Sequence, residues 1–202
     1  MMGPETVKSC ASFAGSRRIA AGTVAEVAAR TKEAMDHGEL GPILIFDDAT
    51  GQPVEIDFRG TVEEVLRGLP SSLTEVKPIE SEPVAPRGPG RPKLGVVARE
   101  VTLLPRHWEW LNDQPGGASV ALRKLVEAAR KANESRDRVR RSQDAAYRFM
   151  TAIAGNLPGF EEANRALFAG DERQFQAHLR DWPADVQAHA RTLAAPAFDR
   201  SA

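Results

Sequence analysis

The sequence Gly22-Thr23-Val24-Ala25-Glu26-Val27 recurs in nearly the same form as Gly60-Thr61-Val62-Glu63-Glu64-Val65. In both copies a threonine stands three residues before a glutamate, which is the spacing of a capping box. The threonine hydroxyl accepts a hydrogen bond from the amide three residues later, and the glutamate accepts one from the threonine amide. The repeat therefore predicts two helix starts, at Thr23 and at Thr61.

Each predicted helix start follows apolar segments with strand-like patterns. Phe13 to Gly22 alternates around a Gly15-Ser16 turn, residues 43–46 are continuously apolar, and residues 54–58 alternate. We therefore predict an α+β fold with two tandem ββα units over residues 8–70. Its sheet would be covered by the apolar helix faces, which comprise Val24, Val27, Ala28, Met35, Val62, Val65, Leu66 and Leu69.

A proline-rich segment follows over residues 71–97. Six of the fourteen prolines lie between Pro70 and Pro92. Proline fixes φ and lacks an N–H donor, so this segment fits poorly into a helix or sheet. We expect a linker that is mobile or in polyproline II conformation.

Residues 98–132 predict a compact strand–helix–turn–helix segment. Residues 99–104 resemble a short strand, Pro105 suits a first helical turn, and Ser119 is the predicted N-cap of the second helix. That helix carries an apolar stripe of Leu122, Leu125, Val126 and Ala129. Over residues 133–196 the apolar spacing and a capping box at Asp171-Glu172-Arg173-Gln174 predict a small helical bundle.

The net charge of −1 hides a basic middle of the chain. Residues 87–141 contain thirteen Arg or Lys and six Asp or Glu, so the rest of the chain is acidic. A local cluster of positive charge attracts anions even when the total is balanced. The charge pattern therefore favours an anionic partner for the middle of the chain.

Two motifs in this basic region resemble DNA-binding elements. The stretch Arg87-Gly88-Pro89-Gly90-Arg91-Pro92-Lys93 resembles an AT-hook, whose extended Gly-Arg-Pro core lies in the minor groove of A·T-rich DNA. The resemblance implies that Arg91 enters the groove, that Pro92 keeps the backbone extended, and that Arg87 and Lys93 contact phosphates. The alternative is a basic proline-rich linker without a ligand.

The second motif, residues 99–131, resembles the ribbon-helix-helix family. The resemblance rests on Val101-Thr102-Leu103-Leu104-Pro105 and on residues 117–126, which open the second helix. It implies a homodimer in which two strands form a ribbon in the major groove. It also implies that the amides of Gly117, Ala118 and Ser119 hold a DNA phosphate.

The strand sequence leaves two registers open for DNA contacts. Aligned on Leu104-Pro105, the groove-facing residues are Arg99, Val101 and Leu103. A slip of one residue buries Val101 and Leu103 and presents Glu100 and Thr102 instead. Arg99 and Thr102 are therefore the candidate base-contacting residues, one for each register.

The basic run Arg136, Arg138, Arg140 and Arg141 lies on a predicted helix, with residues 136 and 140 on one face. Arg138 and Arg140 are candidate phosphate contacts, although a solvated helix face is the simpler interpretation. We expect Asp47-Asp48 to form a hairpin turn, where aspartate bonds to nearby amides. The single cysteine, Cys10, predicts a small buried residue, and excludes an internal disulfide or a cage of several cysteines.

The remaining patterns argue against most enzyme classes. The four histidines lack metal-ligand spacing, and the sequence contains no glycine-rich phosphate loop or nucleophile elbow. Nor does it contain a signal peptide or a sufficiently long apolar span, so we expect a cytoplasmic protein. Over nearly its full length the chain is similar to an uncharacterised bacterial family classified only as a domain of unknown function.

The sequence thus favours a dimeric, cytoplasmic DNA-binding protein without a cofactor, in the class of transcriptional regulators. A protein–protein interaction module, in which residues 98–132 only dimerise, is the second hypothesis. An enzyme that uses the N-terminal domain is the third.

Overall fold

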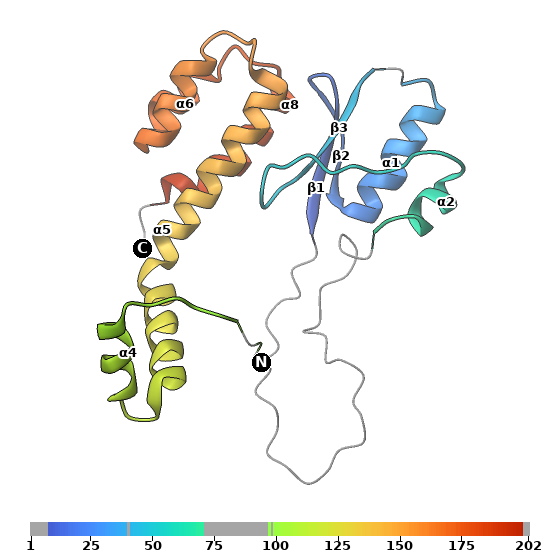
Figure 1. Ribbon diagram of the computed structural model, residues 1–202. Coiled ribbons are helices and arrows are strands. Elements are labelled where there is room, and N and C mark those ends of the chain that lie inside the picture. Colours follow the sequence, from blue (N-terminus) through green and yellow to red (C-terminus); the bar gives the residue numbers. More distant parts are fainter. Residues whose placement is uncertain (1–7, 40, 71–96, 98, 200–202) are drawn as a thin grey trace. The chain divides into compact units, whose positions relative to one another are not determined.

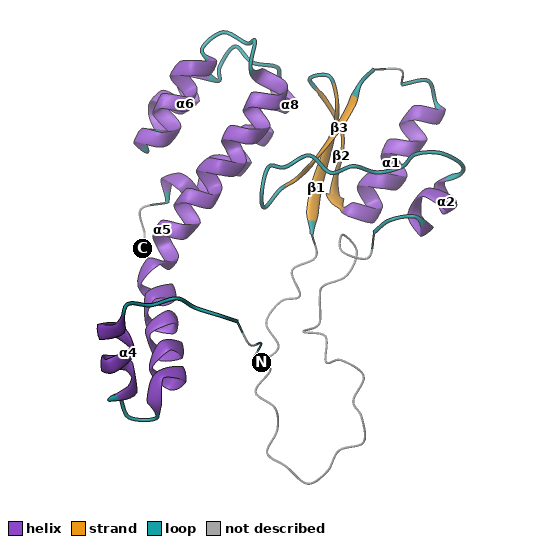
Figure 2. Cartoon of the chain, viewed as in Figure 1, coloured by secondary structure: helices purple, strands orange, loops and turns teal. Residues whose placement is uncertain are grey.

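The computed structural model describes residues 8–39, 41–70, 97 and 99–199, so the predicted linker, apart from residue 97, and its AT-hook-like motif lie outside the described residues. The chain divides into two compact units. Unit 1 comprises residues 1–76 and 136–202, and unit 2 comprises residues 77–135. Figure 1 shows the elements in chain order, and Figure 2 separates helices, strands and loops by colour. The chain has the expected α+β composition, with one small antiparallel sheet and a majority of helices.

The sheet of unit 1 has three strands in the order β2-β1-β3. Strands β1 (Ser9–Ala14) and β2 (Arg17–Thr23) form the predicted hairpin, and β3 (Ile43–Asp47) pairs antiparallel with β1. The tight turn uses Gly15 at a φ of 57°, in the left-handed region that glycine enters without strain. Central strand β1 places Ala11 and Phe13 in the core.

Both predicted capping boxes are formed. Helix α1 (Val24–Asp36) starts at Thr23, whose hydroxyl accepts from the Glu26 amide while the Glu26 carboxylate accepts from the Thr23 amide. Helix α2 (Val62–Arg67) starts in the same way at Thr61. Val24, Val27, Ala28 and Val65 are buried as expected, whereas Met35 and Leu66 are exposed.

The predicted strand over residues 54–58 is not formed, which corrects the expectation of two complete ββα units. The segment touches β3 only through a bridge between Phe46 and Pro53 and a 2.8 Å hydrogen bond from the Val54 amide to the Ile45 carbonyl. Val54, Ile56 and Phe58 nevertheless alternate with exposed residues and pack partly buried against the core beside α1. The period of two therefore identified the buried side correctly but did not guarantee a hydrogen-bonded ladder.

The C-terminal part of unit 1 is helical. After α5 (Gly117–Ala154) come α6 (Phe160–Ala169), α7 (Glu172–His178) and α8 (Ala184–Phe198). Helix α7 begins at Asp171, whose carboxylate accepts from the Gln174 amide, but the reciprocal bond of a full capping box is not among the described contacts. Trp182 anchors the turn before α8 by donating from Nε1 to the Pro158 carbonyl at 2.8 Å.

One hydrophobic core joins the sheet to these helices within unit 1. Phe149 of α5 lies 5.3 Å from Phe13 and 5.2 Å from Phe46 between ring centroids. The approach is close at Gly51, where a Cβ atom would come within 2.1 Å of the Ala145 carbonyl oxygen. Buried aromatic rings and this tight backbone contact together fix the sheet against α5.

Candidate functional site

Unit 2 contains a helix–turn–helix made of α4 (Pro105–Asn112) and the first part of α5. Proline at the first position of α4 costs no hydrogen bond, because that amide has no partner inside a helix. The connecting turn uses Gly116 and Gly117, at φ values of 89° and 74°. The two helices are therefore joined by a short turn in which a β-carbon would be strained at both glycines.

The second helix begins earlier than predicted. It starts at Gly117 and not after an N-cap at Ser119, because the two left-handed glycines end the turn before that residue. The Gly117 amide donates to the Gln114 carbonyl at 2.9 Å. Of the three amides expected to hold a phosphate, only those of Ala118 and Ser119 lack a described acceptor outside the helix.

Residues 99–104 are not a strand in this structure, in contrast to the sequence prediction. They precede α4 as an extended segment, with Leu104 at φ −67° and ψ 149°, and no described residue pairs with them in a ladder. Arg99, Val101 and Thr102 are all exposed. The single chain therefore favours neither of the two registers considered for the DNA-facing side.

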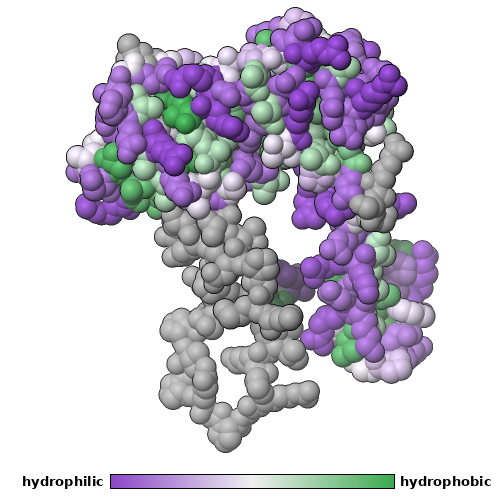
Figure 3. Space-filling model, turned by 180° about the vertical axis from the view of Figure 1, so that it is seen from behind, coloured by the Kyte–Doolittle hydropathy of each residue, from purple (hydrophilic) through white to green (hydrophobic). Residues whose placement is uncertain are grey.

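Several large apolar side chains are exposed on unit 2. Among its described residues only Leu111 and Ala121 are buried apolar residues. Six other apolar side chains are between 37% and 56% exposed, namely Val101, Leu104, Trp108, Trp110, Leu125 and Val126. We call these six residues the apolar face. Figure 3 shows hydrophobic surface on this unit, at the lower right, among hydrophilic residues.

The basic run at residues 136–141, where α5 enters unit 1, is solvent-accessible. Arg138 forms a 3.2 Å ion pair with Asp199, and Arg140 forms a 2.9 Å pair with Asp137. Ion pairs between such exposed groups contribute little stability and exchange readily with another anion. Arg136 and Arg141 are exposed as well. The run can therefore contact phosphates, although two of its members already have carboxylate partners.

A second polar cluster is buried between the sheet and α8 and was not predicted. His189 is 4% exposed, and its Nε2 faces Asp48 Oδ1 across 3.6 Å, too far for a good hydrogen bond. Both atoms are buried without a hydrogen-bond partner among the described residues. Asp48 Oδ2 accepts from the Ser9 hydroxyl at 2.6 Å.

Burial dominates the electrostatics of this pair. It lowers the pKa of His189, because Phe13 and Phe149 surround the ring and leave an imidazolium poorly solvated, while Asp48 opposes that shift. Burial and the nearby carboxylates also raise the pKa of the Cys10 thiol to about 11. Cys10 is 1% exposed, which confirms the predicted buried position.

Asp47, the neighbour of Asp48 in the sequence, forms the hairpin turn that the sequence predicted. The Asp47 carboxylate accepts from the amides of Ala49 and Thr50, both at 2.9 Å. Asp48 would have seemed an equivalent turn residue, and only the packing of α8 distinguishes it. Among the described residues no group of three or more His, Cys, Asp and Glu side chains could hold a metal ion.

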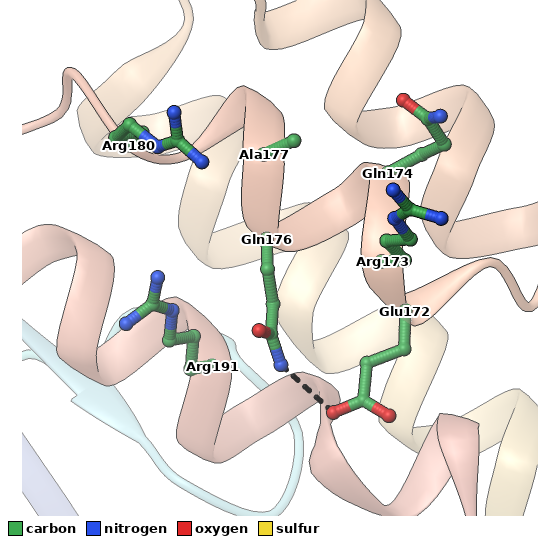
Figure 4. A pocket seen from close by; sticks show the side chains of 7 residues that line it. All are labelled: Glu172, Arg173, Gln174, Gln176, Ala177, Arg180 and Arg191. Atoms are coloured by element: carbon green, nitrogen blue, oxygen red, sulfur yellow. Dashed lines mark hydrogen bonds between the residues drawn. The ribbon is translucent and has the colours of Figure 1, made fainter.

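A third feature is a shallow groove in unit 1, lined by side chains of α7, of the turn that follows it and of α8. It has a volume of about 660 Å³ and contains three arginines, Arg173, Arg180 and Arg191. Figure 4 shows Arg180 and Arg191 extending from two different segments, with Glu172 turned toward Gln176. In the sequence only Arg173 and Arg180 could have been grouped, because residues seven apart share a helix face.

A family model matches residues 9–194 of the chain and is described as an uncharacterized protein conserved in bacteria (DUF2239). The chain belongs to this DUF2239 family. No curated protein and no solved structure matches the chain.

The DUF2239 match spans both units. It includes the candidate DNA-contacting residues, the apolar face and the arginine groove. Within the part of the chain that the structure describes, no helix has the length and apolarity needed to cross a membrane.

Proposed function

We propose that this DUF2239 protein is a homodimeric DNA-binding protein, acting as a transcriptional regulator. The observation that carries the proposal is the apolar face of unit 2, whose six large side chains remain exposed while only Leu111 and Ala121 among the described residues of this unit are buried apolar residues. Exposed apolar groups of this density mark an interaction surface, because each one that leaves water stabilises the complex.

A second copy of the same chain is the occupant that fits this face. The extended residues 99–104 form no ladder with any described residue, and an extended segment with a free edge tends to pair with another chain. An extended segment followed by two helices matches the ribbon-helix-helix order, in which two copies supply one strand each. Dimerisation would pair the segments and cover the apolar face in a single step.

The basic residues that precede and follow residues 99–135 in sequence supply the DNA-binding part of the proposal. Arg138 and Arg140 lie on α5, and the AT-hook-like residues Arg87, Arg91, Pro92 and Lys93 precede the extended segment. The amides of Ala118 and Ser119 at the start of α5 add partial positive charge. Bacterial DNA lies in the cytoplasm, so the proposal also places the protein there.

A dimer without DNA binding is the second candidate, and one observation favours it. Residues 99–135 contain six Arg or Lys and five Asp or Glu, so the described part of unit 2 is almost neutral. The positive excess lies on either side of it, in residues 87–93 and 136–141. Under this alternative the apolar face serves assembly alone.

Fluorescence anisotropy with the full-length protein distinguishes the two candidates. Labelled genomic duplexes are titrated at about 50 mM and about 200 mM salt, because neutralised phosphates release counterions and binding then weakens steeply with salt. Light scattering on the same sample gives the molecular mass. A dimer that binds duplex in a salt-dependent manner supports the first candidate. A dimer that binds no duplex at low salt establishes the second, and a monomer contradicts both.

A further inference from the structure

Three arginines gather in one groove of unit 1 without a carboxylate partner. Arg173, Arg180 and Arg191 line it, and none of them forms an ion pair with a described residue. The other arginines of this unit include five that do form such pairs, Arg17, Arg59, Arg138, Arg140 and Arg165. The groove thus concentrates positive charge that the chain itself leaves uncompensated.

The single carboxylate in the groove accepts from an amide of the groove and not from an arginine. Glu172 Oε1 accepts a hydrogen bond from Gln176 Nε2 at 2.8 Å, drawn as the dashed line in Figure 4. Three cations and one anion leave the lining positive. Like charges held near one another repel, so an anion that enters lowers the electrostatic energy of the groove.

The geometry of the lining also restricts what the anion can be. Ala177 is its only apolar residue, lying between the positions of Arg173 and Arg180 along the chain. The groove has no aromatic ring for a nucleobase and no hydrocarbon wall for a lipid chain. Recognition must therefore act on charged oxygens. A guanidinium can donate two parallel hydrogen bonds to a phosphate, and the side-chain amide of Gln174 adds a further donor.

We propose that this groove binds the phosphate groups of a polyanionic ligand. Three guanidiniums drawn from two segments match a ligand with more than one phosphate. Such groups come either from a free phosphorylated small molecule or from a nucleic-acid backbone, and both present the same oxygens to the arginines. The site is separate in sequence from unit 2 and does not depend on the proposed dimer.

Calorimetric titration of the full-length protein with inorganic tripolyphosphate is the first arm of the test. We expect Arg180→Gln and Arg191→Gln each to weaken binding about tenfold, since each removes a charge-assisted pair of hydrogen bonds. Arg165→Gln is the matched control. Arg165 is an exposed arginine of the same unit whose partner is Glu162, and its loss should leave the affinity unchanged. Circular dichroism verifies that all variants remain folded.

The second arm measures duplex DNA binding of the same variants by anisotropy. Weaker tripolyphosphate binding with unchanged duplex affinity identifies a free phosphorylated molecule as the source. Weaker duplex binding identifies the nucleic-acid backbone as the source. Equal affinities of wild type and both groove variants for both probes would overturn the proposal. That result would leave the dimer and its DNA affinity untouched, so the two proposals fail independently.

Discussion

The two units differ in how far each completes its own core. In unit 1 the sheet and four helices bury large side chains such as Phe13, Phe149 and Leu179 almost completely. In unit 2 the described residues bury only Leu111 and Ala121, and larger apolar side chains stay in water. Exposed apolar surface of this kind is typical of interaction sites. This contrast is the basis for proposing that unit 2 associates with a second copy of the chain.

Removing a large core side chain from unit 1 should have the largest effect. Phe149→Ala leaves a cavity between Phe13, Phe46 and His189, and should lower the free energy of unfolding by about 3–5 kcal/mol. Urea unfolding followed by circular dichroism measures the change. The matched substitution in unit 2, Trp110→Ala, should lower the free energy of unfolding of the monomer less, because that ring is already 52% exposed. Equal costs at the two positions would remove the distinction between the units.

Placing a charge on the apolar face should break the dimer without unfolding unit 1. Val126→Glu buries a carboxylate at the proposed interface, which should raise the dimer dissociation constant about a hundredfold or more. Light scattering over a concentration series gives the constant.

Phe168→Glu is the control for this variant. Phe168 is 52% exposed on α6 of unit 1, close to the 56% of Val126, but lies outside the apolar face. It should leave the molecular mass unchanged. If Val126→Glu also leaves the mass unchanged, the apolar face is not the dimer interface.

The basic residues that precede and follow residues 99–135 should differ in their sequence preference. Arg91→Ala should weaken binding to A·T-rich duplex by about 1–3 kcal/mol and should affect binding to G·C-rich duplex less. The reason is that the narrow minor groove of A·T-rich DNA has a stronger negative potential, which attracts the guanidinium. Arg138→Ala and Arg140→Ala should weaken both duplexes equally and by smaller amounts, since phosphate contacts carry no sequence information. Paired titrations on both duplexes measure this. Unchanged affinities after Arg91→Ala would show that residues 87–93 are only a basic proline-rich linker.

The smallest expected effect concerns pH and the buried His189 of unit 1. Its pKa is lowered on folding, so the unfolded chain binds a proton more readily than the folded one. The neutral ring makes its whole contribution to the free energy of unfolding above the ordinary histidine pKa of 6.5. That contribution decreases as the pH falls below this value. Melting temperatures at several pH values should therefore decline less steeply in His189→Gln than in wild type. His37→Gln, at an exposed histidine, should follow wild type.

The predictions from sequence were accurate where the signal was local. The capping boxes at Thr23 and Thr61 formed because each needs only residues three positions apart. The hairpin at Gly15 and the buried Cys10 followed from the period of two and from glycine chemistry. The prediction of a strand over residues 54–58 was only half right. Alternation indicates which side chains are buried, but it does not supply a strand to pair with.

The candidate sites required the tertiary structure. Arg191 joins Arg173 and Arg180 only because α8 packs beside α7, and nothing in their spacing indicates it. Asp48 meets His189 across 141 positions of the chain because Phe13, Phe46 and Phe149 hold the sheet against the helices. The sequence by itself determined the helix starts, the hairpin and the separation of basic and acidic regions, because these depend on neighbouring residues. Only the tertiary structure decided which distant side chains share a surface and which apolar residues stay exposed, because burial depends on what the rest of the chain places nearby.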